Sequence, residues 1–88
     1  MTSPTPTESR IRDFLIQDVL YDRELRELSL DENLIEKGLL DSLSILKVVT
    51  FCEENFEVKI PDQEVVPDNL ESVRAMAALV ERVRGGKQ

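Results

Sequence analysis

Apolar residues recur at helical spacing in three stretches of the chain. The first stretch places a stripe on one side of a helix, made of Ile11, Phe14, Leu15 and Val19. Thr5 can cap this helix, because Pro6 suits the first helical position and Glu8 stands three residues after Thr5, as a capping box requires. A cap at Thr7 is the alternative. The pattern predicts a first helix whose stripe packs into a core.

The second stretch predicts a helix from about Ser42 to Phe56. Its core side gathers the apolar residues Ile45, Val48, Val49, Cys52 and Phe56. The opposite side presents Leu43, Leu46, Lys47, Thr50 and Glu54. Two leucines on an exposed face suit a docking surface for another protein, so these five residues are the candidate partner-binding set. Cys52 lies within the core set and is interpreted as a small buried hydrophobe.

The third stretch follows a connecting segment that contains two prolines. Pro61 holds Ile60 in extended geometry, and a brief helix over residues 62–66 is predicted before Pro67 stops it, with Val65 or Val66 covering the core. A longer helix is expected to open at residue 68 or 69, where Asp68 and Glu71 have capping-box spacing. Its core side comprises Val73, Met76, Ala77, Val80 and Val83. Arg82 and Arg84 suit its negative end, and Gly85-Gly86 should terminate it.

Between the first two helices, residues 21–40 have no helical period but stay rich in apolar side chains. The anchors expected are Leu25, Leu28, Leu30, Leu34, Ile35, Leu39 and Leu40. Long loops in compact domains are uncommon and usually functional, and this one leads directly to Ser42. Gly38 is predicted to adopt a positive φ just before that point.

The pattern as a whole predicts an all-α fold, a four-helix bundle of three longer helices and one short helix with a long loop between the first and second helices. We expect a flexible lead over residues 1–4, one domain over 5–84 and a flexible tail over 85–88. Eighty-eight residues form one small domain that buries about 60–65% of its unfolded surface, which argues against a deep enzyme cleft.

The composition excludes several classes of function. The sequence has no histidine, which excludes Ser-His-Asp and Cys-His catalysis, and one cysteine, which excludes an internal disulfide and gives no metal-ligand spacing. No membrane span or signal peptide is recognised, so we expect a cytoplasmic protein. The net charge of −7 opposes nucleic-acid and membrane binding and favours partners with basic patches, although it could also serve solubility alone.

The pair Asp41-Ser42 marks the start of the second helix. Asp and Ser both cap helices, so either side chain can satisfy the first-turn N–H groups. Ser42 is also well placed to carry an attached anion, because free backbone donors and the positive end of the helix dipole lie beside it. A plain cap and an anion attachment point are both compatible with this spacing.

The stretch Gly38-Leu39-Leu40-Asp41-Ser42-Leu43 resembles the attachment motif of acyl and peptidyl carrier proteins. The resemblance runs from about Leu34 to Val83, through Glu53-Glu54-Asn55-Phe56 and Ile60-Pro61-Asp62. It implies that Ser42, flanked by Asp41 and Leu43, is esterified by 4′-phosphopantetheine from coenzyme A. The thiol of that group carries an intermediate as a thioester, and the second helix meets the partner enzymes.

The same resemblance implies partners and a cargo. The partners would be a phosphopantetheinyl transferase, a loading enzyme (an adenylating ligase or an acyltransferase) and downstream tailoring or condensing enzymes, all serving a non-catalytic carrier that we expect to be monomeric. Candidate cargo-lining residues, for which ordinary core packing is the alternative, are Val48, Val49, Cys52 and Val65. Ser44 and Lys47 stand where bacterial fatty-acid carriers usually place carboxylates, which argues against a housekeeping fatty-acid role.

Two classes of function follow. The first is a carrier, with an aminoacyl or peptidyl carrier of specialised metabolism favoured by Lys47 over a polyketide or fatty-acyl carrier. The second is an unmodified acidic helical adaptor that binds another protein through Leu43 and Leu46. Cargo identity is not encoded in the pattern, because the loading enzyme reads the substrate.

Overall fold

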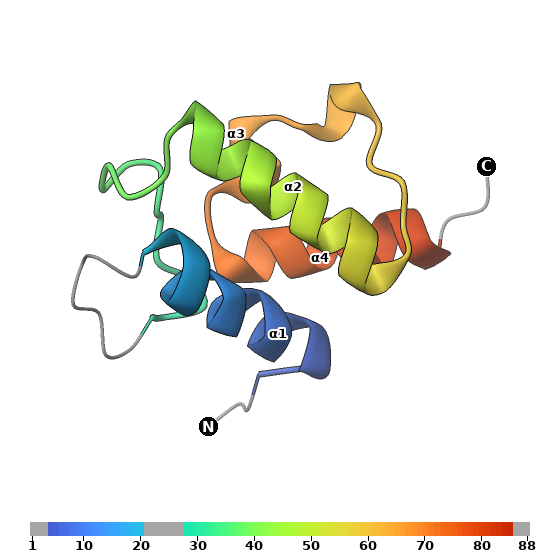
Figure 1. Ribbon diagram of the computed structural model, residues 1–88, viewed down its shortest axis with the longest axis horizontal. Helices are drawn as coiled ribbons and strands as arrows, with labels where there is room; N and C mark the ends of the chain where they lie inside the picture. The colour runs from blue at the N-terminus through green and yellow to red at the C-terminus, as the bar shows by residue number, and fades with distance from the viewer. Residues whose placement is uncertain (1–3, 21–27, 86–88) are drawn as a thin grey trace.

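The computed structural model describes residues 4–20 and 28–85 of the chain. In these residues all regular structure is helical and no strand is present. Figure 1 shows the elements in chain order: α1 (Pro6–Phe14), its π-helical continuation η1 (Leu15–Val19), α2 (Ser42–Phe56), the 3-10 turn η3 (Asp62–Glu64), α3 (Pro67–Leu70) and α4 (Val73–Gly85). Three helices are longer and α3 is short, which confirms the predicted fold class. None of the described helices has the length and apolar character needed to cross a membrane.

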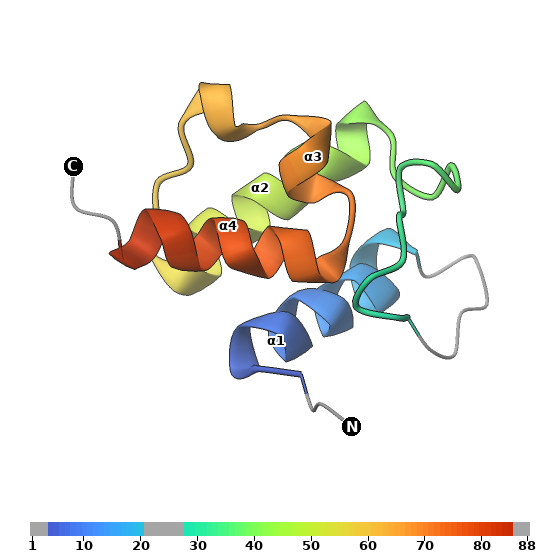
Figure 2. The same ribbon diagram turned by 180° about the vertical axis from the view of Figure 1, so that it is seen from behind.

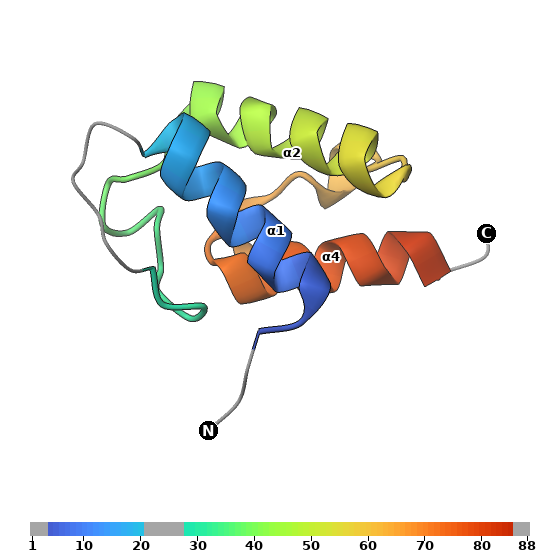
Figure 3. The same cartoon turned by 60° about the horizontal axis from the view of Figure 1, so that its bottom comes forward.

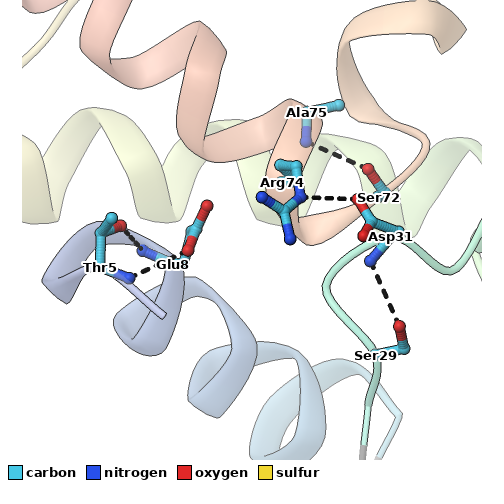
Figure 4. Close-up of polar contacts among 7 residues, drawn as sticks. All are labelled: Thr5, Glu8, Ser29, Asp31, Ser72, Arg74 and Ala75. Carbon is cyan, nitrogen blue, oxygen red and sulfur yellow. Dashed lines mark hydrogen bonds and ion pairs between the residues drawn. The ribbon is translucent and has the colours of Figure 1, made fainter. Parts of the chain in front are cut away.

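The predicted capping box opens α1. Thr5 Oγ1 accepts from the Glu8 N–H at 3.1 Å, and Glu8 Oε1 accepts from the Thr5 N–H at 2.9 Å (Figure 4). Pro6 occupies the first helical turn, where no N–H is required. Thr7, the alternative cap, instead donates its hydroxyl to Glu81 at 2.7 Å and ties α1 to α4.

The apolar stripe of α1 and η1 packs against the other helices. Ile11 and Leu15 are fully buried, whereas Phe14 and Val19 are half-buried at the edge of the core. Phe14 stacks on Phe51 of α2 with ring centroids 4.1 Å apart. Figure 3 shows α1 crossing α4, with its continuation η1 lying close to the start of α2.

The described part of the long loop is pinned to the bundle, as predicted. Its buried anchors are Leu28, Leu34 and Leu40, and its half-buried ones are Leu30, Ile35 and Leu39. Leu34 donates its N–H to the carbonyl of Glu71 at 2.7 Å, which joins the loop to the chain before α4. Leu25 lies outside the described residues.

A second contact joins the loop to α4. The Arg74 N–H donates to the Leu30 carbonyl at 2.9 Å. Figure 4 shows the second bond, in which Arg74 Nε donates to Asp31 Oδ1 at 2.6 Å. The ion pair is solvent-exposed, so the backbone hydrogen bond and the buried leucines hold the loop more firmly than the charges do.

The third part of the chain differs from the prediction at both of its helices. The expected helix over 62–66 is only the 3-10 turn η3, and Pro67 begins the separate short helix α3. Proline is favoured at a first helical position because its φ is already helical and its missing N–H is not needed there. Val66 is extended and 39% exposed, so Val65 is the valine that packs against the core.

The long helix predicted from residue 68 or 69 begins instead at Val73. Ser72 is the cap, because its Oγ accepts from the Ala75 N–H at 3.1 Å (Figure 4). The predicted capping box of Asp68 with Glu71 is therefore wrong. Figure 2 shows α3 as a short separate turn lying beside α4.

Helix α4 supplies much of the core. Buried residues on its inner side are Val73, Met76, Ala77, Leu79 and Val80, with Val83 half-buried. Arg82 and Arg84 lie in the last turn, as predicted, and bind Glu64 at 2.7 Å and Glu81 at 2.8 Å. The helix ends at Gly85, and the predicted stop at Gly86 lies outside the described residues.

Candidate functional site

Asp41 alone caps helix α2. Its Oδ1 accepts from the Ser44 N–H at 2.9 Å, and the first helical hydrogen bond runs from the Ile45 N–H to the Asp41 carbonyl at 2.9 Å. The pKa of the Asp41 carboxyl is lowered, chiefly by the hydrogen bond from the Ser44 backbone and next by one from the Ser44 side chain. The interpretation of Ser42 as a possible cap is therefore corrected: Ser42 is the first residue of the helix proper.

The Ser42 side chain is exposed at this helix start. Among residues 4–20 and 28–85, no side chain or carbonyl accepts or donates a hydrogen bond at its hydroxyl. The N–H groups of Ser42 and Leu43 lie in the first turn, where a helix offers them no internal acceptor. The hydroxyl is thus accessible, with backbone donors beside it.

The loop fixes where this hydroxyl lies. Gly38 has a φ of 75°, which confirms the predicted left-handed residue. Two hydrogen bonds close the turn around it: the Gly38 N–H donates to the Ile35 carbonyl at 3.0 Å, and the Leu39 N–H donates to the Leu34 carbonyl at 2.9 Å. Leu40 is buried, so Ser42 follows an anchored residue by only two positions.

Helix α2 separates a buried side from an exposed one, as its period predicts. Val48, Cys52 and Phe56 are buried and Ile45 and Val49 are half-buried. Burial raises the pKa of the Cys52 thiol to about 12, with a smaller contribution from the charge of Glu53. The thiol is therefore protonated at neutral pH, which fits a packed hydrophobe and excludes a reactive thiolate.

The exposed side of α2 borders an open cleft of about 520 Å³. Leu43 and Leu46 are 64% and 59% exposed there. The lining residues from α2 are Leu43, Leu46, Lys47, Thr50, Phe51, Glu54 and Asn55, and those from α1 and η1 are Phe14 and Asp18. The structure brings all five predicted partner-face residues together along this cleft.

Sequence reasoning missed four residues of the cleft. Phe51 and Asn55 lie at the border of the α2 core stripe, and Phe14 and Asp18 come from another element. The Phe14–Phe51 stack joins the two walls. The sequence does place an aromatic residue at the edge of each predicted apolar stripe, Phe14 in the first helix and Phe51 in the second. That these two residues stack could be known only from the way α1 packs on α2.

The chain matches a known family over most of its length. The family model described as "Phosphopantetheine attachment site" matches residues 13–80. An acyl carrier protein of Akkermansia muciniphila is 29% identical over 83 residues, which cover 94% of this chain and 99% of the relative. The chain belongs to the acyl and peptidyl carrier protein family. Members of this family hold acyl groups on covalently attached 4′-phosphopantetheine, and this carrier protein has that prosthetic group.

Two further relatives have names that state different cargoes. A D-alanyl carrier protein of Streptococcus pyogenes serotype M5 is 30% identical over 67 residues, covering 76% of this chain and 84% of the relative. The probable acyl carrier protein PigG of a Serratia species is 37% identical over 51 residues, covering 58% of this chain and 59% of the relative. The family is therefore shown, while its members do not agree on one kind of cargo.

The start of α2 fits such a group chemically. A phosphodiester at Ser42 would be linked covalently, so the carrier protein needs an accessible hydroxyl there and no binding pocket. The helix end adds an attraction of about 0.3–1 kcal/mol at an exposed site, which the neighbouring Asp41 carboxylate opposes. Accessibility of Ser42 is thus the property that matters most.

The suggested cargo-lining residues do not border the cleft. Val48 is 0% exposed and Cys52 is 2% exposed, and both are packed into the core with Val49 and Val65 half-buried beside them. The cleft lies on the other side of α2. These four residues therefore pack as ordinary core residues, which was the alternative to a role in lining a cargo site.

We predict that the carboxylate charge of Asp41 makes the cap pH-dependent. Because its folded pKa is lowered, the charge stabilises the folded protein above the unfolded value of about 3.9, and this contribution is lost as pH falls through the folded pKa. The free energy of unfolding of wild type should therefore fall more than that of Asp41→Asn between about pH 6 and pH 3.

Urea unfolding of both proteins across this range measures the difference. Asp13→Asn, the same chemical change at an exposed position of α1, should follow wild type. If Asp41→Asn and wild type lose stability in parallel, the charge does not contribute to the cap.

Proposed function

We propose that Ser42 is the attachment point of 4′-phosphopantetheine and that the protein presents thioester-bound cargo to partner enzymes. The observation that carries this proposal is the exposed Ser42 hydroxyl at the first position of α2, spared from capping by Asp41 and lying inside the family match. When bound, the group supplies a flexible arm with a terminal thiol that holds the cargo.

The chain's own residues position the arm and do not perform chemistry on it. The sequence has no histidine, and the described residues next to Ser42 include no base hydrogen-bonded to its hydroxyl. A transferring enzyme must therefore activate Ser42. The carrier raises the local concentration of cargo at a partner's site, and the partner supplies the catalysis.

Partner choice is assigned to the face formed by Leu43, Leu46, Lys47, Thr50 and Glu54. These residues share one exposed side of α2 next to Ser42, and two of them are large apolar side chains in solvent. The partners we propose are a phosphopantetheinyl transferase, a ligase or acyltransferase that loads the arm, and downstream tailoring or condensing enzymes. The cytoplasmic location and monomeric state stay predictions.

An aminoacyl or peptidyl cargo of specialised metabolism is our preferred finer function. Lys47 is a cation on the docking face and Ser44 is neutral, where housekeeping fatty-acid carriers usually present carboxylates. A relative named a D-alanyl carrier protein supports this preference, and relatives named acyl carrier proteins support a polyketide or fatty-acyl alternative. Mass spectrometry of the acyl group on protein isolated from its native host distinguishes these cargo classes.

The attachment point is tested by removing one hydroxyl. Incubation with coenzyme A and a broad-specificity phosphopantetheinyl transferase should add one phosphopantetheine to wild type and none to Ser42→Ala, measured by intact mass. Ser44→Ala, which removes the next serine of α2, should still be modified. Because Ser42 is exposed and does not cap, Ser42→Ala should change the free energy of unfolding by less than about 0.5 kcal/mol.

Full modification of Ser42→Ala would refute the attachment point. A wild type that remains unmodified together with both variants would also contradict attachment at Ser42.

The docking role of the exposed leucines is tested by introducing a charge. Leu46→Glu should leave the fold intact, because the side chain is 59% exposed, and should slow transfer to or from at least one partner enzyme. Val66→Glu makes the same change at a valine that is 39% exposed and outside the cleft, and it should leave transfer unchanged. Circular dichroism measures whether each variant is folded, and the transfer rates measure whether it still meets its partner. Equal loss of transfer in the two variants would place docking elsewhere.

Lys47 is expected to select among partners. Carrier–enzyme association should slow as salt rises past ~0.15 M, where the Debye length is about 8 Å, because a protein of net charge −7 is steered by basic patches. Lys47→Glu should improve transfer with enzymes that serve acidic fatty-acid carriers and weaken it with the native loading enzyme. Lys59→Glu, exposed and outside the cleft, is the matched charge control. Parallel changes with both enzymes would show that Lys47 is only a solvated surface residue.

A further inference from the structure

Asn33 joins the loop before Ser42 to the connection between α3 and α4. Its Nδ2 donates to Glu71 Oε1 at 3.2 Å, and its Oδ1 accepts from the Glu36 N–H at 2.9 Å. The Asn33 carbonyl accepts from the Lys37 N–H at 3.2 Å and closes the same turn. Figure 2 shows this part of the loop beside the connection that precedes α4. Both polar ends of one side chain are therefore used, one within the loop and one across to another element.

Glu71 binds the loop through its backbone as well as its side chain. Its carbonyl accepts from the Leu34 N–H at 2.7 Å, beside the bond between its carboxylate and Asn33. Asn33 and Glu71 are half-buried, and their chain neighbours Leu34 and Leu70 are 0% and 2% exposed. Because these bonds are partly shielded from water, they hold the loop more firmly than an exposed ion pair would.

A series of hydrogen bonds runs from Glu71 to the two leucines that precede the cap of α2. The Leu34 carbonyl accepts from the N–H groups of residues 39 and 40, at 2.9 and 3.3 Å. The second of these leucines is buried, and the next residue, Asp41, caps the helix. The contact of the loop with Glu71 therefore helps to fix where the cap and the Ser42 hydroxyl lie.

We propose that Asn33 and Glu71 are positioning residues for the modification of Ser42. The proposal rests on attachment at Ser42, and it adds a requirement that exposure of the hydroxyl alone does not meet. A transferring enzyme that docks on α2 must find the hydroxyl in a fixed place relative to the docking face. The pair meets this requirement by holding the loop that leads into α2 against the rest of the bundle, and neither residue touches the reacting atoms.

Introducing a charge at Asn33 tests the pair. Asn33→Asp keeps an acceptor for the Glu36 N–H but places a second carboxylate against that of Glu71, and the two carboxylates repel each other. This part of the loop should then separate from Glu71. With coenzyme A and a broad-specificity phosphopantetheinyl transferase, kcat should fall by about tenfold because the Ser42 hydroxyl is misplaced. KM should stay close to that of wild type, because the docking face of α2 is unchanged. A rise in KM without a fall in kcat would overturn the proposal.

A second substitution should restore the rate. Glu71→Gln alone keeps an oxygen that accepts from Asn33, so its kcat should stay close to that of wild type. When Asn33→Asp and Glu71→Gln are combined, the new amide donates to the new carboxylate, and one hydrogen bond is regained without repulsion. The kcat of this double variant should return toward that of wild type. A double variant as slow as Asn33→Asp would overturn the pairing.

Two controls separate positioning from general stability. Asn69→Asp makes the same change where Asn69 Nδ2 donates to Glu64 Oε1 at 3.1 Å, a contact between α3 and η3 that Arg82 also supports. Val80→Ala removes buried volume from α4 and lowers the free energy of unfolding through a cavity. Urea unfolding measures the stability that each variant loses. At conditions where every variant is folded, kcat should fall only in Asn33→Asp, and an equal fall in either control would overturn the positioning role.

Hydrogen exchange gives a readout that does not depend on activity. In Asn33→Asp the amides of Leu39 and Leu40 should exchange faster than in wild type, while the amide of Leu79 within α4 should keep its protection. Unchanged exchange at both loop leucines, or an equal loss of protection in α4, would overturn the proposal. Intact mass keeps the two proposals distinguishable: if attachment at Ser42 fails, wild type gains no group, whereas if positioning fails, Asn33→Asp is modified as fast as wild type.

Discussion

The hydrogen bond from the Ser44 N–H to Asp41 Oδ1 decides how the neighbouring serine can be used. A helix start needs an acceptor for its first-turn N–H groups, and Ser and Asp compete for this position. Here the carboxylate takes the role, so the Ser42 hydroxyl is not needed for structure. The same bond sets the first residue of α2 and hence the direction in which every later side chain of the helix points.

That direction gives α2 two separate tasks. Val48, Cys52 and Phe56 are buried and hold the helix on the bundle, while Leu43 and Leu46 stay in solvent. Leucines this exposed add little to the core, and two of them beside Ser42 support the proposed docking surface. A partner enzyme is the occupant that we propose for this surface.

The sequence was most informative where local chemistry and periodicity agreed. The bounds of α2, the capping box of Thr5 with Glu8 and the positive φ of Gly38 all follow from rules that involve a few neighbouring residues. The start of α4 did not follow, because Asp68 and Ser72 were both acceptable caps and the choice depended on Pro67 beginning its own turn.

Other features could not be predicted because they depend on tertiary packing. Glu57 ends α2 at a φ of 54°, a conformation that glycine or asparagine usually supplies, so no local signal marked it. The cleft required knowing that η1 approaches α2 and that Phe14 meets Phe51. Exposure of the α2 leucines was predictable from the period, whereas the opposite wall of the cleft was not.

The covalent link explains why relatives share a fold without sharing a cargo. A ligand held by affinity would require a complementary pocket, and that pocket would be visible in the core residues. A tethered cargo is held whatever its structure, because attachment replaces binding energy with effective concentration. We expect discrimination among cargoes to depend on the partner enzymes and on surface side chains of the proposed docking face, such as Lys47. Identities of 29% with an acyl carrier protein and 30% with a D-alanyl carrier protein are therefore compatible with one scaffold that serves different cargoes.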